Sequence, residues 1–403
     1  MTSRIYLDHA ATSAPKPAQV AQRLSRYFLE EGFTAGRGSY ARAAEMEREV
    51  SVARAALAVL LGAESPVQIL FTHSGTESLN LAIQGILGPG DHVVTTILEH
   101  NSVLRPLAAL SNRGQIDVSY VEPNAAGVID PQEISRAMRS ETKLVCVVHI
   151  SNVLGTIQPV QGICELAREH GAYSLIDASQ SVGHLPIDVK EMGCDLLAAP
   201  AHKGLLAPLG TGILYVKPGI ENELQPLLFG GTGTKSESPM QPDELPSRYE
   251  SGSLNVPGII GLAAALEVVT PEFVVQESAR QAKLTEQLIE GLSKIPGLKM
   301  YPFNASPTAQ AGVVSLSIAQ HDPRVIGTIL DEHFQIEVRT GFHCAPKTHD
   351  WLKTAPLGGT VRISIGHTTT EQNIKTTIAA LQEISVSMGN LSRVWSRCFV
   401  TFR

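Results

Sequence analysis

The sequence predicts an α/β fold built on a mainly parallel sheet and followed by a smaller α+β unit. Two observations predict it. Strand-like and helix-like runs alternate from residue 68 to 216, and after Pro257 the pattern changes to that of long helices. Such alternation favours a parallel sheet covered by helices on both faces. The length of 403 residues exceeds what one hydrophobic core usually supports, so two domains are expected.

Short runs of apolar and β-branched residues predict the strands of the larger unit, at 68–72, 92–97, 144–150, 173–176, 195–199 and 212–216. Helix-like stretches lie between them at 77–86, 131–138 and 160–169. Asp130 before Pro131 indicates a helix start, because the carboxylate caps the helix and proline fits its first turn. After a glycine-rich segment at 230–250, the pattern predicts helices at 259–269 and 272–292 and strands near 312–318, 336–339 and 360–365.

Composition excludes several classes of protein. Hydrophobic residues make up 43% of the chain, the net charge is −7, and no run of Lys or Arg suggests a nucleic-acid or anionic-membrane partner. No apolar stretch approaches the ~18 residues that span a bilayer. Residues 1–16 lack the apolar core of a signal peptide, and the five cysteines form no CxxC pair. We therefore expect a cytoplasmic protein with reduced thiols.

Three short motifs carry candidate chemistry, although each alone has an ordinary structural interpretation. SGTE at 74–77 follows a strand and opens a helix, where free amides suit a phosphate but also fit a plain helix cap. Asp177 ends an apolar strand, where it could keep a pyridine nitrogen protonated or serve as a turn residue. Lys203 lies among loops and apolar residues, which can lower the pKa of a lysine so that it forms a Schiff base. The ordinary interpretation is a solvated surface charge.

Together with four further motifs, these segments resemble the class V aminotransferases, of the fold-type I pyridoxal-phosphate enzymes. The resemblance covers nearly the whole chain: YLDHAAT (6–12), SGTES (74–78), EHNS (99–102), HISNVLGT (149–156), DASQ (177–180), HKG (202–204) and YESGSLN (249–255). It implies a large domain with a mainly parallel seven-stranded sheet between helices and a smaller C-terminal α+β domain that carries a cysteine loop. We expect the large domain at 16–257, the small domain at 258–403, and an N-terminal arm at 1–15 that packs with the small domain.

The resemblance also assigns cofactor roles by position. Lys203 would hold pyridoxal 5'-phosphate as a Schiff base and then move the Cα proton of the substrate. Asp177 would pair with the ring nitrogen. His100 would stack on the ring and act as an acid–base group, and its alternative interpretation is a histidine of the core. The remaining cofactor contacts would be Gln180 and Asn152 to the ring oxygen, Gly75, Thr76 and His202 to the phosphate, and Ser253 to the phosphate of the neighbouring subunit in a homodimer.

One position departs from the pattern of these relatives. They carry Ser or Thr three residues before the lysine, where the hydroxyl binds phosphate, and this chain has Pro200. Proline offers no donor. Loss of one hydrogen bond to a charged group costs roughly 1.5–3 kcal/mol, so weaker cofactor binding is expected.

The C-terminal unit selects the reaction, since the fold alone does not. RTGFHCAP at 339–346 resembles the loop of cysteine desulfurases and selenocysteine lyases, and the likeness extends to a bacterial desulfurase-like family in which a histidine, here His349, follows HCAP. A thiolate is a nucleophile, which suits Cys344 to take up sulfur, although a free cysteine is most often a buried apolar residue. A metal site of His343, Cys344 and His349 lacks an evident fourth ligand, so no metal is expected.

Two arginines are candidates for binding the substrate. Arg362, in VRIS, matches the arginine that clamps the α-carboxylate of amino-acid substrates, and a bidentate pair would fix the Cα–H bond relative to the ring. Arg339 opens the cysteine loop and is the second candidate.

The sequence therefore predicts a cysteine desulfurase that converts L-cysteine to L-alanine, forms a persulfide on Cys344 and passes the sulfur to a thiol or protein acceptor. Three alternatives stay open: a selenocysteine lyase acting on L-selenocysteine, another class V transamination or C–S cleavage, and a non-catalytic protein that keeps the fold. Residues 391–403 match no motif.

Overall fold

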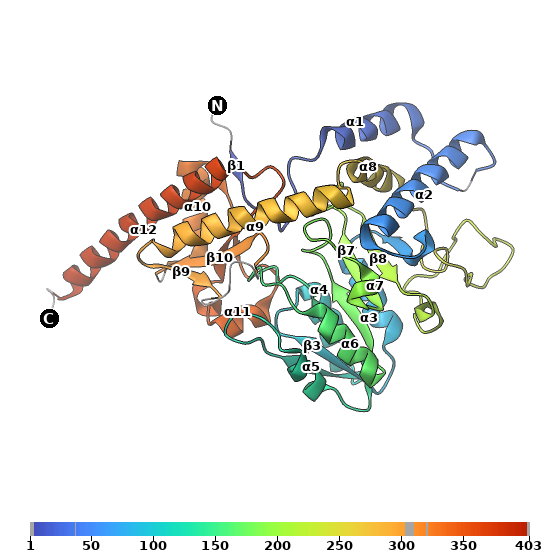
Figure 1. Cartoon of the computed structure of the whole chain (residues 1–403), viewed down its shortest axis with the longest axis horizontal. Coiled ribbons are helices and arrows are strands. Elements are labelled where there is room, and N and C mark those ends of the chain that lie inside the picture. Colours follow the sequence, from blue (N-terminus) through green and yellow to red (C-terminus); the bar gives the residue numbers. More distant parts are fainter. Residues whose placement is uncertain (1–3, 37, 303–309, 320, 401–403) are drawn as a thin grey trace.

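The computed structural model describes residues 4–36, 38–302, 310–319 and 321–400, without the side chains of 389–400. Figure 1 shows a larger unit that contains the main sheet and a C-terminal unit beside it, with α9 running from beside α8 into the C-terminal unit. Among the described residues no single helix is long and apolar enough to cross a membrane. The bent pair of α8 and α9 meets that test by length and composition together.

The larger unit contains a seven-stranded sheet in the order β2-β8-β7-β6-β5-β3-β4. Its strands are β2 (Ile69–Thr72), β3 (Asp91–Thr96), β4 (Ile116–Val121), β5 (Thr142–Val148), β6 (Tyr173–Asp177), β7 (Leu196–Pro200) and β8 (Gly212–Val216). Five neighbouring strands, from β4 through β7, pair in parallel, and β8 runs antiparallel to both β7 and β2. The predicted mainly parallel, seven-stranded sheet is confirmed. Since parallel strands end at one edge, Asp177 and the loop after Pro200 lie at the same edge.

The C-terminal unit is built on an antiparallel sheet of four strands in the order β12-β13-β10-β9. These are β9 (Leu298–Tyr301), β10 (Val313–Ile318), β12 (Arg339–Gly341) and β13 (Thr360–Ser364). Strand β1 (Ile5–Tyr6) pairs in parallel with β11 (Ile336–Glu337), which attaches the N-terminal segment to this unit. The register of β12 and β13 places Arg339 opposite Arg362, so the two predicted substrate-binding arginines are direct neighbours.

Helices cover both faces of the larger sheet. They are α1 (Ala18–Arg26), α2 (Ala41–Leu61), α3 (Gly75–Ile86), α4 (Asn101–Asn112), α5 (Pro131–Ala137), α6 (Val160–His170), α7 (Val189–Met192) and α8 (Val256–Leu266), and the C-terminal unit adds α9 (Pro271–Ser293), α10 (Pro323–Phe334), α11 (Pro346–Leu352) and α12 (Glu371–Val400). Successive strand side chains point to opposite faces. Leu197 therefore packs under α2 and α8, whereas Leu196 packs under α3 and α4.

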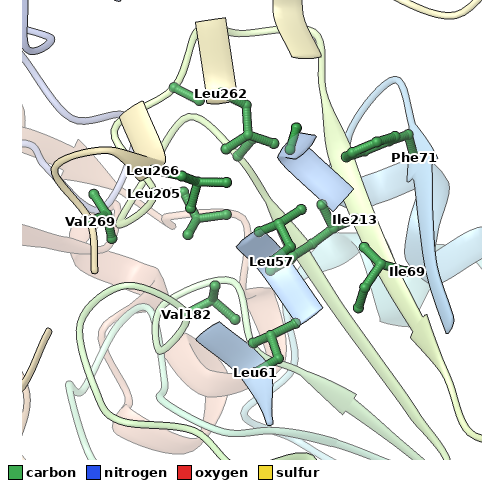
Figure 2. Close-up of a cluster of buried hydrophobic side chains, with 14 of the residues drawn as sticks. Leu57, Leu61, Ile69, Phe71, Val182, Leu205, Ile213, Leu262, Leu266 and Val269 are labelled. Atoms are coloured by element: carbon green, nitrogen blue, oxygen red, sulfur yellow. The ribbon is translucent and has the colours of Figure 1, made fainter. Parts of the chain in front are cut away.

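The core under α2 and α8 also fixes the loop that carries Lys203. Leu57 of α2, Leu262 of α8 and Leu205, two residues after the lysine, are all fully buried in one cluster (Figure 2). Burial of each such leucine contributes roughly 1.5–3 kcal/mol. The loop after β7 is thereby anchored in the core of the larger unit.

The structure also contains a strand that apolar runs do not reveal. Strand β4 is an edge strand in which Asp117 and Ser119 alternate with apolar residues, so it lacks the continuous apolar run of a buried strand. Helix α8 packs against α1 and α2, and its side chains belong to the core of the larger sheet. The predicted domain division between residues 257 and 258 stays a prediction, and this packing favours a boundary nearer Thr270.

Candidate active site

A cavity of about 210 Å³, here called the central cavity, lies at the carboxyl edge of the larger sheet, between the N-terminal segment and the C-terminal unit. The structure brings ten of the twelve predicted site residues to its wall: Gly75, Thr76, His100, Asn152, Asp177, Gln180, His202, Lys203, Arg339 and Arg362. Cys344 lies just outside, in contact with Arg339. Ser253 is exposed and lies outside the lining of the cavity.

Lys203 is placed by the end of β7 and by a tight turn in which the Leu206 amide donates to the Lys203 carbonyl at 2.9 Å. Burial lowers the pKa of its ammonium group to about 8, because a charged amine loses hydration there. The Asp177 carboxylate opposes this shift, and the Arg362 and Arg339 guanidinium groups add to it. An appreciable fraction of the amine is therefore neutral near pH 7, as a nucleophilic lysine requires.

The N-terminus of α3 forms one end of the central cavity. Ser74 caps the helix by accepting a hydrogen bond from the Glu77 amide at 3.1 Å, which leaves the first amides, those of Gly75 and Thr76, without helical partners. A Cβ at Gly75 would approach Pro200 to 3.0 Å, so glycine permits β7 and α3 to lie this close. Thr76 Oγ1 lies 2.8 Å from Ser102 Oγ, which links this end to α4.

Asp177 also lines the central cavity. Its side chain is buried, and its Oδ1 accepts from the Ser179 amide at 2.9 Å, which fixes the carboxylate at the end of β6. Gln180, one turn later, donates its Nε2 to the Ala10 carbonyl at 2.9 Å. The predicted contact of Gln180 with a ring oxygen stays a prediction, and the structure adds a second role, that of holding the N-terminal segment against the cavity.

Two histidines in the wall are held in the neutral state. His100 caps α4, and its Nδ1 accepts from the Ser102 amide at 3.0 Å, so the ring proton resides on Nε2. Burial is the largest cause that lowers the pKa of His100 to about 4, and it lowers that of His202 to the same value. A neutral His100 with its proton on Nε2 can donate one hydrogen bond into the cavity and accept none there.

The cysteine loop is held by hydrogen bonds to its carbonyl groups. Asn152 Nδ2 donates to the His343 carbonyl at 2.7 Å, and the Asn101 amide donates to the Cys344 carbonyl at 2.7 Å. Both His343 and Cys344 have positive φ values, +49° and +60°, a conformation that costs roughly 1–2 kcal/mol for residues other than glycine. The two carbonyl anchors, from the loop after β5 and from α4, offset this cost and hold the loop in place.

The side chain of His343 faces away from the thiol, towards β13. Its Nε2 lies 3.0 Å from Thr360 Oγ1, while His349 Nδ1 lies 2.7 Å from Thr354 Oγ1. Both rings are buried, and burial lowers the pKa of each, that of His349 to about 4. Among the described residues no group of three or more histidine, cysteine, aspartate or glutamate side chains could hold a metal ion.

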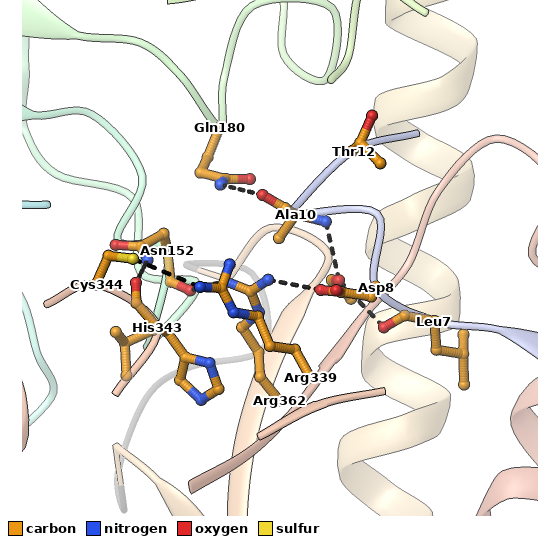
Figure 3. A network of polar contacts seen from close by, with 12 residues as sticks. Leu7, Asp8, Ala10, Thr12, Asn152, Gln180, Arg339, His343, Cys344 and Arg362 are labelled. Carbon is orange, nitrogen blue, oxygen red and sulfur yellow. Dashed lines mark hydrogen bonds and ion pairs between the residues drawn. The ribbon is translucent and has the colours of Figure 1, made fainter. Parts of the chain in front are cut away.

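The two arginines differ in their partners (Figure 3). Arg362 is almost fully buried; its Nη2 donates to Asp8 Oδ1 at 2.7 Å and its Nη1 to the Asn152 carbonyl at 3.1 Å. Its Nε has no partner among the described residues. Arg339 contacts Cys344 through Nη2 and Sγ at 3.5 Å. Arg339 therefore contacts the thiol directly, whereas Arg362 joins the N-terminal segment to the loop after β5.

Three site residues escaped the sequence analysis as individual residues. They are Asp8 of the YLDHAAT motif and Asn101 and Ser102 of the EHNS motif. The sequence predicted no role for any of the three. Asp8 is the one acidic residue of its motif, and this could have indicated a partner for a buried cation. The other two act through backbone amides and a small hydroxyl, which leave no signature in a sequence.

The central cavity fits pyridoxal 5'-phosphate. A buried carboxylate, helix amides without helical partners and a lysine with a lowered pKa all line it. These are the groups that a protonated pyridine, a phosphate and an aldehyde require. Proline at position 200 offers no phosphate donor, and the remaining predicted donors are Gly75, Thr76 and His202.

Comparison with known proteins is consistent with this geometry. Residues 5–376 match the family model described as aminotransferase class-V. The chain is 37% identical over 389 residues to a probable cysteine desulfurase of Methanothermobacter thermautotrophicus, covering 96% of both chains. It is 33% identical over 391 residues to a probable cysteine desulfurase of Pyrococcus abyssi, covering 95% of both.

A solved structure is similar over nearly the whole chain. The apo structure of a cysteine desulfurase from Thermococcus onnurineus superposes with a TM-score of 0.88 at 30% identity, covering 95% of each chain. The predicted fold is confirmed by this match, and the individual residue roles stay predictions.

We predict that Asp8→Asn destabilises the protein more than an equivalent change at the surface. The variant leaves the buried Arg362 guanidinium without a charged partner, so the free energy of unfolding should fall by about 3 kcal/mol. Urea-induced unfolding measures the change. Asp117→Asn is the control, because it removes an exposed pair with Arg139 and should cost less than about 1 kcal/mol. Equal effects of the two variants would contradict the structural importance of the Asp8–Arg362 pair.

Proposed function

Because this chain belongs to the aminotransferase class V family, which depends on pyridoxal phosphate, we propose that it is a cysteine desulfurase. It converts L-cysteine to L-alanine and takes the sulfur as a persulfide on Cys344. The observation that carries the proposal is the position of the Cys344 thiol, in contact with Arg339 at the edge of a cavity that contains Lys203 and Asp177. Full-length relatives with the same printed activity support it.

His100 would stack on the cofactor ring, Asn152 and Gln180 would contact its ring oxygen, and four further groups of this subunit would hold the cofactor. Asp177 would pair with the ring nitrogen, and Lys203 would bind the aldehyde carbon. The amides of α3 at Gly75 and Thr76, with His202, would bind the phosphate. When bound, the cofactor supplies a sink for the electron pair left at Cα of the substrate.

The protein's own residues then position the substrate and move protons. Arg362 and Arg339 bind the α-carboxylate, which orients the Cα–H bond towards Lys203. The neutral Lys203 amine takes the Cα proton, and its lowered pKa keeps it ready to do so near pH 7. The Nε2–H of His100 donates a hydrogen bond into the cavity.

Sulfur transfer is a displacement at the substrate sulfur. The Cys344 thiolate attacks this atom, so a sulfur–sulfur bond forms as the carbon–sulfur bond breaks. The Cβ atom of the substrate takes up a proton in place of the sulfur, and the product leaves as alanine. Atoms balance, since one cysteine and one enzyme thiol give one alanine and one enzyme persulfide.

We further propose that the protein acts as a homodimer. Ser253 is exposed, and the resemblance assigns it to the phosphate site of the neighbouring subunit. L-Cysteine is the proposed substrate, and the sulfur acceptor is a separate thiol.

We predict that the purified holoenzyme releases sulfide and alanine from L-cysteine in equal amounts when a reducing thiol is present. Lys203→Ala should abolish both products, while Lys217→Ala, a lysine paired with Asp195 away from the cavity, should change neither. Cys344→Ser should keep the absorbance at roughly 410–430 nm that the cofactor's own electronics produce and should lose persulfide formation. Full sulfur transfer by Cys344→Ser would contradict the role of the thiol.

The same assay separates the alternatives. A keto acid product would indicate transamination, and turnover of selenocysteine alone would indicate a selenocysteine lyase. A protein that binds the cofactor but turns over no amino acid would favour a non-catalytic role.

We predict that the apoenzyme recombines with the cofactor faster as pH rises, with half of the maximal rate near pH 8. Only the neutral Lys203 amine attacks the aldehyde, and its pKa is lowered to about 8. The rate of appearance of the visible absorbance between pH 6 and 10 measures this. A midpoint above pH 10 would show that the lysine keeps its ordinary pKa and would contradict the effect of burial.

A further inference from the structure

A second cavity of about 490 Å³, here called the acceptor groove, adjoins the central cavity and follows helices α3 and α4. Thr76, His100 and Ser102 line both cavities, so these residues form the wall that the two cavities share. Cys344 lines the acceptor groove, whereas Arg339, which contacts its sulfur, lines the central cavity. The thiol therefore lies where the two cavities meet.

The charge of the acceptor groove is positive. Arg105 and Arg113 of the α4 region line it, and no aspartate or glutamate does so within the described part of the chain. Both side chains are exposed, and neither guanidinium has an ion pair or hydrogen bond to a described residue. The other lining side chains that are polar, among them Asn80 and Gln84, are neutral. The groove thus offers two uncompensated cations to a ligand.

The size of the groove favours a small molecule over an extended protein segment. Its volume lies within the range of roughly 300–1,000 Å³ that small-molecule pockets occupy. Arg105 and Arg113 are eight residues apart, which is about 12 Å along a helix. Two carboxylates at the ends of a tripeptide-sized molecule can span this distance while a central thiol reaches Cys344.

We propose that the acceptor groove binds a low-molecular-weight thiol carrying carboxylates, which removes the sulfur from Cys344. The inference rests on the proposed function and extends it, because it assigns a chemical class to the sulfur acceptor. Arg105 and Arg113 bind the carboxylates of the acceptor and have no contact with the amino-acid substrate.

The transfer step needs no oxidant or reductant. The acceptor thiol gives its proton to solvent, and its thiolate attacks the outer sulfur of the Cys344 persulfide. A new sulfur–sulfur bond forms on the acceptor as the bond to Cys344 breaks. The electron pair of the broken bond stays on Cys344, which returns to the thiolate.

The experiment isolates this step from desulfuration. The holoenzyme is loaded on Cys344 with inorganic polysulfide, which transfers one sulfur to the thiolate and leaves a shorter polysulfide; Cys344→Ser corrects for sulfur bound elsewhere. After removal of excess polysulfide, the persulfide is mixed with one of three thiols. These are the anionic tripeptide γ-glutamylcysteinylglycine, neutral 2-mercaptoethanol and cationic cysteamine. The rate of sulfur loss from the enzyme is measured for each, relative to its reaction with a small-molecule persulfide.

We expect the wild-type protein to favour the anionic thiol roughly tenfold or more at low ionic strength, and added salt to reduce this preference. The double variant Arg105→Gln/Arg113→Gln should lose this preference for the anionic thiol. The double variant Arg105→Glu/Arg113→Glu should prefer cysteamine instead. Arg136→Gln, an exposed arginine on α5, is the matched control and should leave it unchanged. Alanine formation from L-cysteine in a single turnover should be the same in these three variants as in the wild type.

Three results would overturn the inference. One is a wild-type rate that does not depend on the charge of the thiol, and another is a preference that survives in the double variants. The third is a change of oligomeric state in the double variants by gel filtration, which would make this surface a contact between subunits. Absence of the alanine burst in the wild type would instead refute the proposed function, so the two failures are distinguishable.

Discussion

The buried guanidinium of Arg362 is the constraint on which the rest of the site depends. It belongs to β13 of the C-terminal unit. It donates hydrogen bonds to the Asp8 carboxylate of the N-terminal segment and to the Asn152 carbonyl of the loop after β5. A charge this deeply buried requires partners, because hydration is lost. The pair therefore holds three distant parts of the chain at one point. Asn152 extends the connection, since its side-chain amide holds the carbonyl beside Cys344.

This arrangement separates the two chemical tasks of the thiol. Arg339 and the central cavity lie on one side of Cys344, where the substrate sulfur would arrive. Arg105 and Arg113 lie on the other, in the acceptor groove. The short loop, anchored at both of its carbonyls, leaves the thiol little freedom to travel between them. Transfer in and out of Cys344 is therefore expected without a large loop movement.

The sequence was sufficient for the features that depend on local pattern. Strand ends placed Asp177 and Lys203 at one edge of the sheet, and the capping pattern at Ser74 located the start of α3. It was not sufficient for contacts between segments far apart in the chain, such as Asp8 with Arg362, which are separated by 354 positions. Nor could it show that Asn152 binds a backbone carbonyl, because that carbonyl is aimed by the positive φ values of the cysteine loop. The edge strand β4 was missed for a similar reason, since its pairing depends on β3 and not on its own apolar content.

The most direct test of this account is hydrogen–deuterium exchange on Arg362→Lys. Lysine keeps the positive charge but lacks the planar fork that binds Asp8 and the Asn152 carbonyl together. We expect faster amide exchange, relative to the wild type, in three segments at once: residues 5–13, 149–156 and 339–346. Faster exchange confined to β13 and its immediate strand neighbours would contradict the central role of Arg362.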